Sequence, residues 1–120
     1  MITHITSIMI YVADQAAAEQ FWTEKVGFEV STRHDLGNGA FWIEVGPAGG
    51  QTRLVLCPRS LARDWAQKRA SVAFHCDDVL LAFAMLKAAG VEVGDPPREM
   101  AGTHMAMFRD PDGNVFVLKG

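Results

Sequence analysis

The stretch Gly27-Phe28-Glu29-Val30 returns 63 residues later as Gly90-Val91-Glu92-Val93. An aspartate stands thirteen residues before each glycine: Asp14 in the first half, and Asp77, with Asp78 beside it, in the second. Aspartate is a favoured helix N-cap, and a glycine after an apolar periodic segment commonly ends a helix. The repeat therefore predicts two copies of one unit, each with a capped helix that ends at a glycine and leads into a strand.

Short segments rich in β-branched and aromatic side chains surround both expected helices and alternate as strands do. Ala18, Phe21 and Trp22 form one apolar stripe on the first helix, residues 15–26. Both halves follow the order strand, helix and three strands. Strands are expected at residues 5–12, 28–30, 41–45 and 53–57 and again at 71–76, 91–93, 103–109 and 115–119, with the second helix at 79–89.

These elements predict one α+β domain, residues 1–120, made of two βαβββ units. We place the first unit at residues 1–57, a polar and basic linker at 58–70 and the second unit at 71–120. Hydrophobic residues make up 49% of the chain and charged residues 21%, which is typical of one globular domain with its own core.

Charge and cysteine content exclude several classes of function. A formal charge of −3 disfavours nucleic acid as a partner. No apolar run is long enough for a membrane span, and the first residues lack the basic flank of a signal peptide, so we expect a cytoplasmic protein without a membrane partner. Cys57 and Cys76 have no C-x-x-C spacing, which favours reduced, buried strand residues over a redox pair or a zinc site.

Three motifs carry a resemblance to a known family. They are Tyr11-Val12-Ala13-Asp14, the helix end Phe21-Trp22-Thr23-Glu24-Lys25-Val26-Gly27-Phe28 and the closing Phe108-Arg109-Asp110-Pro111-Asp112-Gly113-Asn114. With the duplicated unit, they resemble the vicinal oxygen chelate superfamily, which includes glyoxalase I, extradiol dioxygenases and bleomycin-resistance proteins. The resemblance implies that each unit curls into half of a funnel-shaped mixed sheet with the helices outside. It also implies a homodimer.

In metal-dependent members, the resemblance implies a cluster of two histidines and one or two carboxylates in the funnel. The corresponding positions here are Ser7 and Ser71 on the first strand of each unit, and Val55 and Val117 on the last. A serine hydroxyl binds a divalent ion poorly at neutral pH, and valine offers no donor atom. We therefore expect no metal ion and no other cofactor.

Period-two alternation assigns side chains to the funnel face. Ser7, Met9 and Tyr11 share one face of the first strand, while the intervening isoleucines and valine face the helix. Either Trp42 or Phe41 is expected to supply an aromatic wall. The candidate ligand-binding residues are Ser7, Met9, Tyr11, Trp42, Arg53, Val55, Ser71, His75, His104, Phe108 and Val117.

The polar members of this set keep two interpretations each. His75 is either a partly exposed histidine bonded to the backbone or a general base, and His104 has the same alternatives. Arg53 is either a solvated edge-strand charge or a clamp for an anionic ligand group. Tyr11 is either a core aromatic with its hydroxyl at the rim or a ligand contact.

The leading hypothesis is a metal-free protein of the glyoxalase and bleomycin-resistance type that binds a small organic molecule, aromatic or planar, in the funnel. The alternative is an enzyme: a lyase, an isomerase or a dioxygenase-like protein. It would use His75 or His104 as acid and base, with Arg53 holding a carboxylate or enolate, or an atypical metal site. A third hypothesis is a domain kept for a protein partner.

Overall fold

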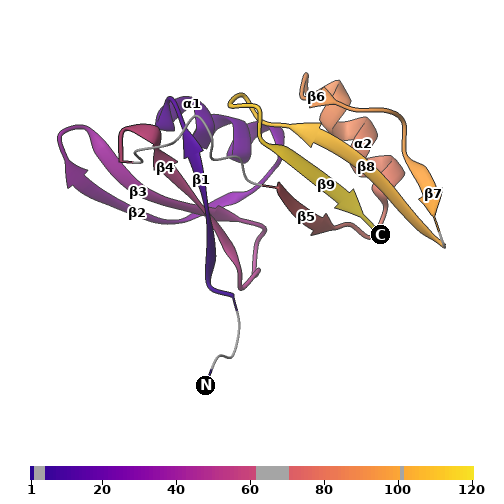
Figure 1. The fold of residues 1–120 in the computed structure, drawn as a ribbon, viewed down its shortest axis with the longest axis horizontal. Helices are drawn as coiled ribbons and strands as arrows, with labels where there is room; N and C mark the ends of the chain where they lie inside the picture. The colour runs from indigo at the N-terminus through magenta and orange to yellow at the C-terminus, as the bar shows by residue number, and fades with distance from the viewer. Residues whose placement is uncertain (2–4, 62–70, 101) are drawn as a thin grey trace. The chain divides into compact units, whose positions relative to one another are not determined.

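The computed structural model describes residue 1 and residues 5–61, 71–100 and 102–120, and the chain divides into two compact units, Met1–Lys68 and Arg69–Gly120 (Figure 1). The α+β architecture is confirmed, because each unit combines a mixed sheet with a helix. The funnel stays a prediction. Among the described residues, no helix is long and apolar enough to cross a membrane.

The first unit has a four-stranded sheet in the order β1-β4-β3-β2, in which β1 runs parallel to β4 and the other pairs are antiparallel. Its elements are β1 (Ser7–Val12), the helix α1 (Gln15–Gln20), a π-helical segment η1 (Phe21–Lys25), β2 (Glu29–Gly37), β3 (Ala40–Gly46) and β4 (Arg53–Pro58), followed by a 3-10 turn η2 (Arg59–Leu61). The rest of the expected linker, residues 62–70, lies outside the described residues.

The second unit repeats this topology in the order β5-β9-β8-β6, and β7 also pairs with β8. Its elements are β5 (Ser71–His75), α2 (Val79–Ala88), β6 (Glu92–Val93), β7 (Arg98–Met100), β8 (Thr103–Arg109) and β9 (Val115–Lys119). The sequence patterns did not predict β7 as a separate strand. Pro96 and Pro97 lie between β6 and β7 and cannot donate to the ladder, so the strand that is continuous as β2 in the first unit is interrupted here.

The helix caps correct one detail of the repeat. Asp14 caps α1, because its carboxylate accepts a hydrogen bond from the Ala17 N–H at 3.1 Å. In the second unit the cap is Asp78 and not Asp77: its carboxylate accepts from the Leu81 N–H at 3.0 Å. The spacing from cap to glycine is therefore twelve residues in the second unit against thirteen in the first, so the expected equal spacing is wrong.

The π-helical segment η1 accommodates the extra residue of the first unit. There the Val26 N–H donates to the Phe21 carbonyl, five residues earlier, at 3.2 Å. One inserted residue in a helix commonly produces such a turn, because the wider ring keeps the flanking side chains on their original faces. The expected stripe is retained, since Ala18, Phe21 and Trp22 are all buried, but the single helix over residues 15–26 is replaced by α1 and η1.

Each unit buries the face of its sheet that lies against its own helix. In the first unit the buried strand residues are aliphatic: Ile10, Val12, Ile43, Val45, Leu54 and Leu56. In the second unit three phenylalanines stack on one another, with ring centroids 5.3 to 6.3 Å apart: Phe74, Phe108 and Phe116. The opposite face of each sheet, which we call the open face, carries the candidate site residues discussed next.

Candidate functional site

The open face of the first sheet brings together six of the predicted residues. The parallel register pairs Ser7 with Arg53, Met9 with Val55 and Tyr11 with Cys57, so these side chains share one face. On β3, Glu44 pairs with Val55, which places Glu44 and its alternate neighbour Trp42 on the same face. Trp42 and not Phe41 therefore supplies the aromatic side chain. The six are Ser7, Met9, Tyr11, Trp42, Arg53 and Val55.

Glu44 is a residue of this face that the sequence analysis did not select. Its carboxylate accepts a hydrogen bond from the Trp42 indole N–H at 2.8 Å, so the two half-buried side chains fix each other. The register places Glu44 between Thr32 on β2 and Val55 on β4. The alternation of residues 41–45 would have indicated Glu44 if the face of Trp42 had been known.

Arg53 is held by the protein itself. Its Nε donates to the Ser31 hydroxyl at 3.1 Å, and its Nη1 lies 3.5 Å from the Pro47 carbonyl oxygen. The side chain crosses Gly46 so closely that an added Cβ at this glycine would lie 2.9 Å from the Arg53 Cδ. These contacts favour a brace between β4, the β2 bulge and the β3–β4 turn over an anion clamp.

Two predicted face assignments in the second unit are wrong. The β8–β9 register pairs Met107 with Val117 and Phe108 with Phe116. Phe108 is therefore buried on the helix side, and by alternation His104 points to the same side. The physical reason is that each alternate set of β8 contains two apolar residues, so the hairpin register decides which set is buried, and the stacked phenylalanines occupy the core.

The open face of the second sheet consequently differs from the predicted one. Ser71, His75 and Val117 lie on it as expected. Met105 and Met107 take the place of His104 and Phe108, and Met107 is half exposed. These two thioethers are the residues that the sequence analysis missed on this side. Met105 and Met107 occupy the positions that Trp42 and Glu44 hold in the first unit.

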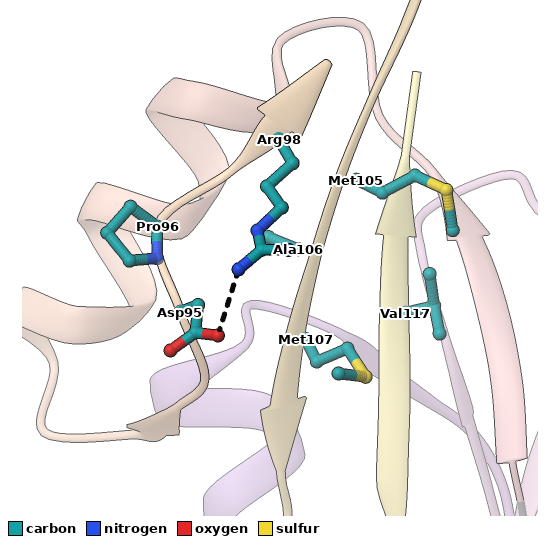
Figure 2. A pocket seen from close by; sticks show the side chains of 7 residues that line it. All are labelled: Asp95, Pro96, Arg98, Met105, Ala106, Met107 and Val117. Carbon is teal, nitrogen blue, oxygen red and sulfur yellow. Dashed lines mark ion pairs between the residues drawn. The ribbon is translucent and has the colours of Figure 1, made fainter. Parts of the chain in front are cut away.

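A cavity of about 220 Å³ opens on this face where the strand is interrupted between β6 and β7. Figure 2 shows Asp95, Pro96 and Arg98 on one side and the two thioethers with Val117 on the other. The Arg98 Nη2 lies 3.6 Å from the Asp95 Oδ2, and both side chains are highly exposed. An exposed pair of this kind contributes little to stability, so the apolar wall is the main feature of the cavity. Its lining residues are Asp95, Pro96, Arg98, Met105, Ala106, Met107 and Val117.

The two candidate catalytic histidines do not converge. The His75 Nε2 lies 3.4 Å from the Asp77 Oδ1, but the His75 side chain is 79% exposed and the aspartate fully so. His104 lies on the other face of the same sheet, where its backbone pairs with Gly120. Acid and base groups must both reach the same substrate. The register therefore gives no support to catalysis by this pair.

The donor set does not fit the metal ion that the family resemblance implies. Within the part of the chain that the structure describes, no three side chains of histidine, cysteine, aspartate or glutamate come together. Val55 is fully buried between Met9 and Glu44 and has no donor atom. A divalent transition ion needs three or four such ligands in one place. We therefore assign no step of any reaction to a metal ion.

The cysteines are free and are not poised for reaction. Burial raises the pKa of the Cys57 thiol above its usual range, which disfavours the reactive thiolate. Burial likewise raises the pKa of Cys76, while its hydrogen bond with the Lys119 backbone acts in the opposite direction. Cys57 is a buried strand residue, as expected, whereas Cys76 is half-buried and lies just beyond β5.

Comparison with known proteins agrees with this geometry. The family model Glyoxalase/Bleomycin resistance protein/Dioxygenase superfamily matches residues 2–118. The chain is 43% identical over 119 residues to the uncharacterized protein YetH of Bacillus subtilis (strain 168), with 99% of both chains covered.

Solved structures give the same answer for the fold. A member of the glyoxalase/bleomycin resistance protein/dioxygenase superfamily from Sphaerobacter thermophilus DSM 20745 superposes with a TM-score of 0.89 at 30% identity, covering 98% of this chain and 97% of that one. TnmS3, an antibiotic binding protein from Streptomyces sp. CB03234, superposes with a TM-score of 0.83 at 35% identity, covering 98% and 94%. The chain belongs to the glyoxalase/bleomycin resistance protein/dioxygenase superfamily.

Proposed function

We propose that this protein binds a small planar organic molecule on the open face of its first sheet and does so without a metal ion. The observation that carries the proposal is the half-buried Trp42 ring, held by Glu44 on a face that also presents the exposed Met9. A fixed aromatic side chain beside apolar strand residues is typical of small-molecule sites. The similarity to an antibiotic binding protein supports the same class of ligand.

The open face of the second sheet is a separate surface that also suits an apolar ligand group. Met105 and Met107 are flexible, polarisable side chains that adapt to the shape of an apolar ligand. The cavity of about 220 Å³ is smaller than the roughly 300–1,000 Å³ of sites for drug-sized molecules. We infer that it accommodates a ring or a side group and that the open sheet face contacts the rest of the ligand.

Titration with hydroxymethylanthracene, a neutral planar aromatic probe, tests the proposal. Binding to the native state must raise the melting temperature by mass action, so we expect a rise that grows with probe concentration. Trp42→Ala should weaken binding at least tenfold by removing the ring, which corresponds to about 1.4 kcal/mol. Phe41→Ala is the matched control, because Phe41 alternates to the other face of β3 and should leave the affinity nearly unchanged.

The same assay tests the absence of a metal ion. Nickel, zinc, manganese and iron(II) should leave the melting temperature unchanged, and elemental analysis of purified protein should find no stoichiometric transition metal. A stoichiometric metal with a matching thermal shift would contradict the proposal. Failure of hydroxymethylanthracene to shift the melting temperature at any soluble concentration would contradict binding of planar aromatic ligands.

We also propose that the protein is a homodimer that acts in the cytoplasm. The support is the family resemblance for the dimer and the two free cysteines for a reducing compartment. Light scattering coupled to gel filtration should give twice the chain mass of 13.1 kDa. A mass of one chain at micromolar concentration would contradict the dimer.

A further inference from the structure

The row of side chains around Glu44 places a carboxylate among weakly polar neighbours. The register gives the order Thr32, Glu44, Val55 and Met9 across β2, β3, β4 and β1. Val55 is fully buried, and Glu44 itself is half-buried. A carboxylate in such surroundings is less well hydrated than one on an open surface, and it gains more from an opposite charge.

No basic side chain of the described residues forms an ion pair with Glu44. The basic positions on this face nearest to Glu44 in the register are His34, which pairs with Trp42, and Arg53, whose guanidinium is directed to the Ser31 hydroxyl and the Pro47 carbonyl oxygen. In the described part of the chain, the Trp42 indole N–H is the only side-chain donor to the Glu44 carboxylate, and it reaches one oxygen, Oε2. The charge of Glu44 is therefore oriented but not neutralised.

The indole also adds a second element that attracts a cation. An aromatic face next to a carboxylate favours a positively charged nitrogen twice, through the ring quadrupole and through the negative charge. In the second unit the corresponding positions are Met105 and Met107, which carry neither a charge nor a ring. Of the two open faces, only that of the first sheet combines an aromatic ring with a carboxylate at these positions. The fold itself therefore does not require this pair.

We propose that the open face of the first sheet recognises a cationic nitrogen of the ligand, held by the Glu44 carboxylate beside the Trp42 ring. The ligand class is then a planar organic amine that is protonated at neutral pH. The inference rests on the proposed function, since it names the charge of the molecule that the same site binds. Trp42 binds the planar part and Glu44 selects for the amine.

Two matched probes test the inference. Aminomethylanthracene is protonated at neutral pH, and hydroxymethylanthracene is its neutral counterpart of nearly equal size. Fluorescence anisotropy of the anthracene should give a dissociation constant for the amine that is at least tenfold lower, which is the usual range for a charge-assisted hydrogen bond. Raising the salt concentration should weaken the amine more than the alcohol.

Glu44→Gln identifies the group responsible. The variant keeps an amide oxygen that can accept the Trp42 N–H, so the fold and the ring orientation should be preserved. We expect the preference for the amine to fall about tenfold while the affinity for the alcohol stays within about twofold. Glu24→Gln, an exposed glutamate of η1 that accepts from Gln20, is the matched control and should keep the preference.

The outcomes separate the inference from the function on which it rests. If the alcohol binds but the amine has no advantage, or if Glu44→Gln keeps the full advantage, the cation site is wrong and the proposed function stands. If neither probe binds the native protein, both are wrong. A preference that Glu44→Gln abolishes and Glu24→Gln retains supports both.

Discussion

The two units of this chain share a topology but place their buried aromatic side chains in different layers. Among the described residues, those of the first unit lie in the helical segment η1: Phe21 and Trp22. Those of the second unit lie in the sheet, Phe108 and Phe116, and the buried residues in and after α2 are aliphatic: Val79, Leu86 and Val91. The register equates Phe74, Phe108 and Phe116 with Ile10, Val45 and Leu54.

This exchange shows that the fold specifies the total volume between helix and sheet more strictly than the residue at each position. Interiors are packed closely, so a large residue in one layer requires a smaller one in the facing layer. Once the core is satisfied in either way, the open faces are free to differ. The first carries Trp42 and Glu44 and the second carries Met105 and Met107.

The largest expected effect is the loss of the phenylalanine stack. Phe116→Ala removes the ring that lies 5.3 Å from Phe108 and 5.7 Å from Phe74, and among the described residues no helix aromatic belongs to that stack. We expect the free energy of unfolding to fall by about 3–5 kcal/mol. Urea denaturation followed by circular dichroism measures this loss.

The reverse substitution tests the exchange itself. Leu54→Phe adds a ring to a sheet position whose helix layer already contains Trp22, so it should overpack the first unit and cost about 1–3 kcal/mol. If Leu54→Phe leaves the free energy of unfolding unchanged, the first core has spare volume and the idea of exchanged layers is wrong.

A second difference between the units lies at the first residue of each helix. In the first unit the β3–β4 ladder is paired only at Glu44 and Val45, and the Gln15 carboxamide bridges the strands beyond it. Its Nε2 donates to the carbonyl oxygens of Phe41 at 2.6 Å and Leu56 at 2.7 Å, and its Oε1 accepts from the Phe41 N–H at 3.0 Å.

The second unit has no such gap, because β8 and β9 pair without interruption over five residue pairs. The residue that follows its cap is the buried, apolar Val79. A continuous ladder satisfies the backbone groups, so a side-chain bridge is not needed there. The first helix residue is therefore polar where the strand ladder is incomplete, as in the first unit, and apolar where the ladder is complete, as in the second.

Gln15→Val places at the start of α1 the residue type that starts α2, and it removes the side-chain bridge between β3 and β4. The Phe41 N–H and two carbonyl groups lose their partners in a partly buried place, so we expect a loss of about 2–4 kcal/mol. Gln20→Val, on the same helix with an exposed side-chain bond to Glu24, is the matched control and should cost less than about 0.5 kcal/mol. An equal loss in the two variants would contradict the bridging role of Gln15.

The same contrast explains what the sequence could predict. Most strands and both helices were found because their alternation and caps are local, and the first open face was found because Ser7 and Tyr11 mark one face of β1 and Arg53 marks one face of β4. The buried face of β8 was not predicted correctly, since Met105 and Met107 on one face are as apolar as Ala106 and Phe108 on the other. The turn at Asp110–Asn114 fixes that register through backbone bonds that alternation does not encode.

The position of Glu44 and the π-helical segment were missed for related reasons. Glu44 is assigned to a face only when β3 is paired with β4, which is a contact between distant segments. The segment η1 depends on a surplus of one residue, and the adjacent acids Asp77 and Asp78 concealed that surplus because either could have been the cap. Hydrophobic periodicity predicts neither the pairing of distant strands nor a one-residue irregularity within a helix.

The smallest expected effect concerns the last turn, where the units differ in charge. Asp110 is buried and accepts hydrogen bonds from the backbone N–H groups of Asp112 and Asn114 and from the Asn114 side chain. The corresponding connection of the first unit, residues 47–52, contains no acidic residue. Desolvation by burial is the largest influence on Asp110 and raises the pKa of its carboxyl, although the bonds from Asn114 act in the opposite direction.

A raised pKa in the folded state means that the folded protein retains this proton more strongly than the unfolded chain. The contribution of Asp110 to stability is therefore complete below the unfolded pKa of about 3.9 and is lost as the pH rises through the folded pKa. Asp110→Asn removes this titration, so the stability of the natural protein relative to the variant should decrease with rising pH above about pH 4, measured by urea unfolding at a series of pH values. Asp35→Asn is the matched comparison, because this carboxylate near the end of β2 also accepts a backbone N–H but is exposed. If the stability of the natural protein relative to the variant instead increases with pH, the three hydrogen-bond donors stabilise the charged carboxylate more than burial destabilises it. The turn would then require the charged form of Asp110.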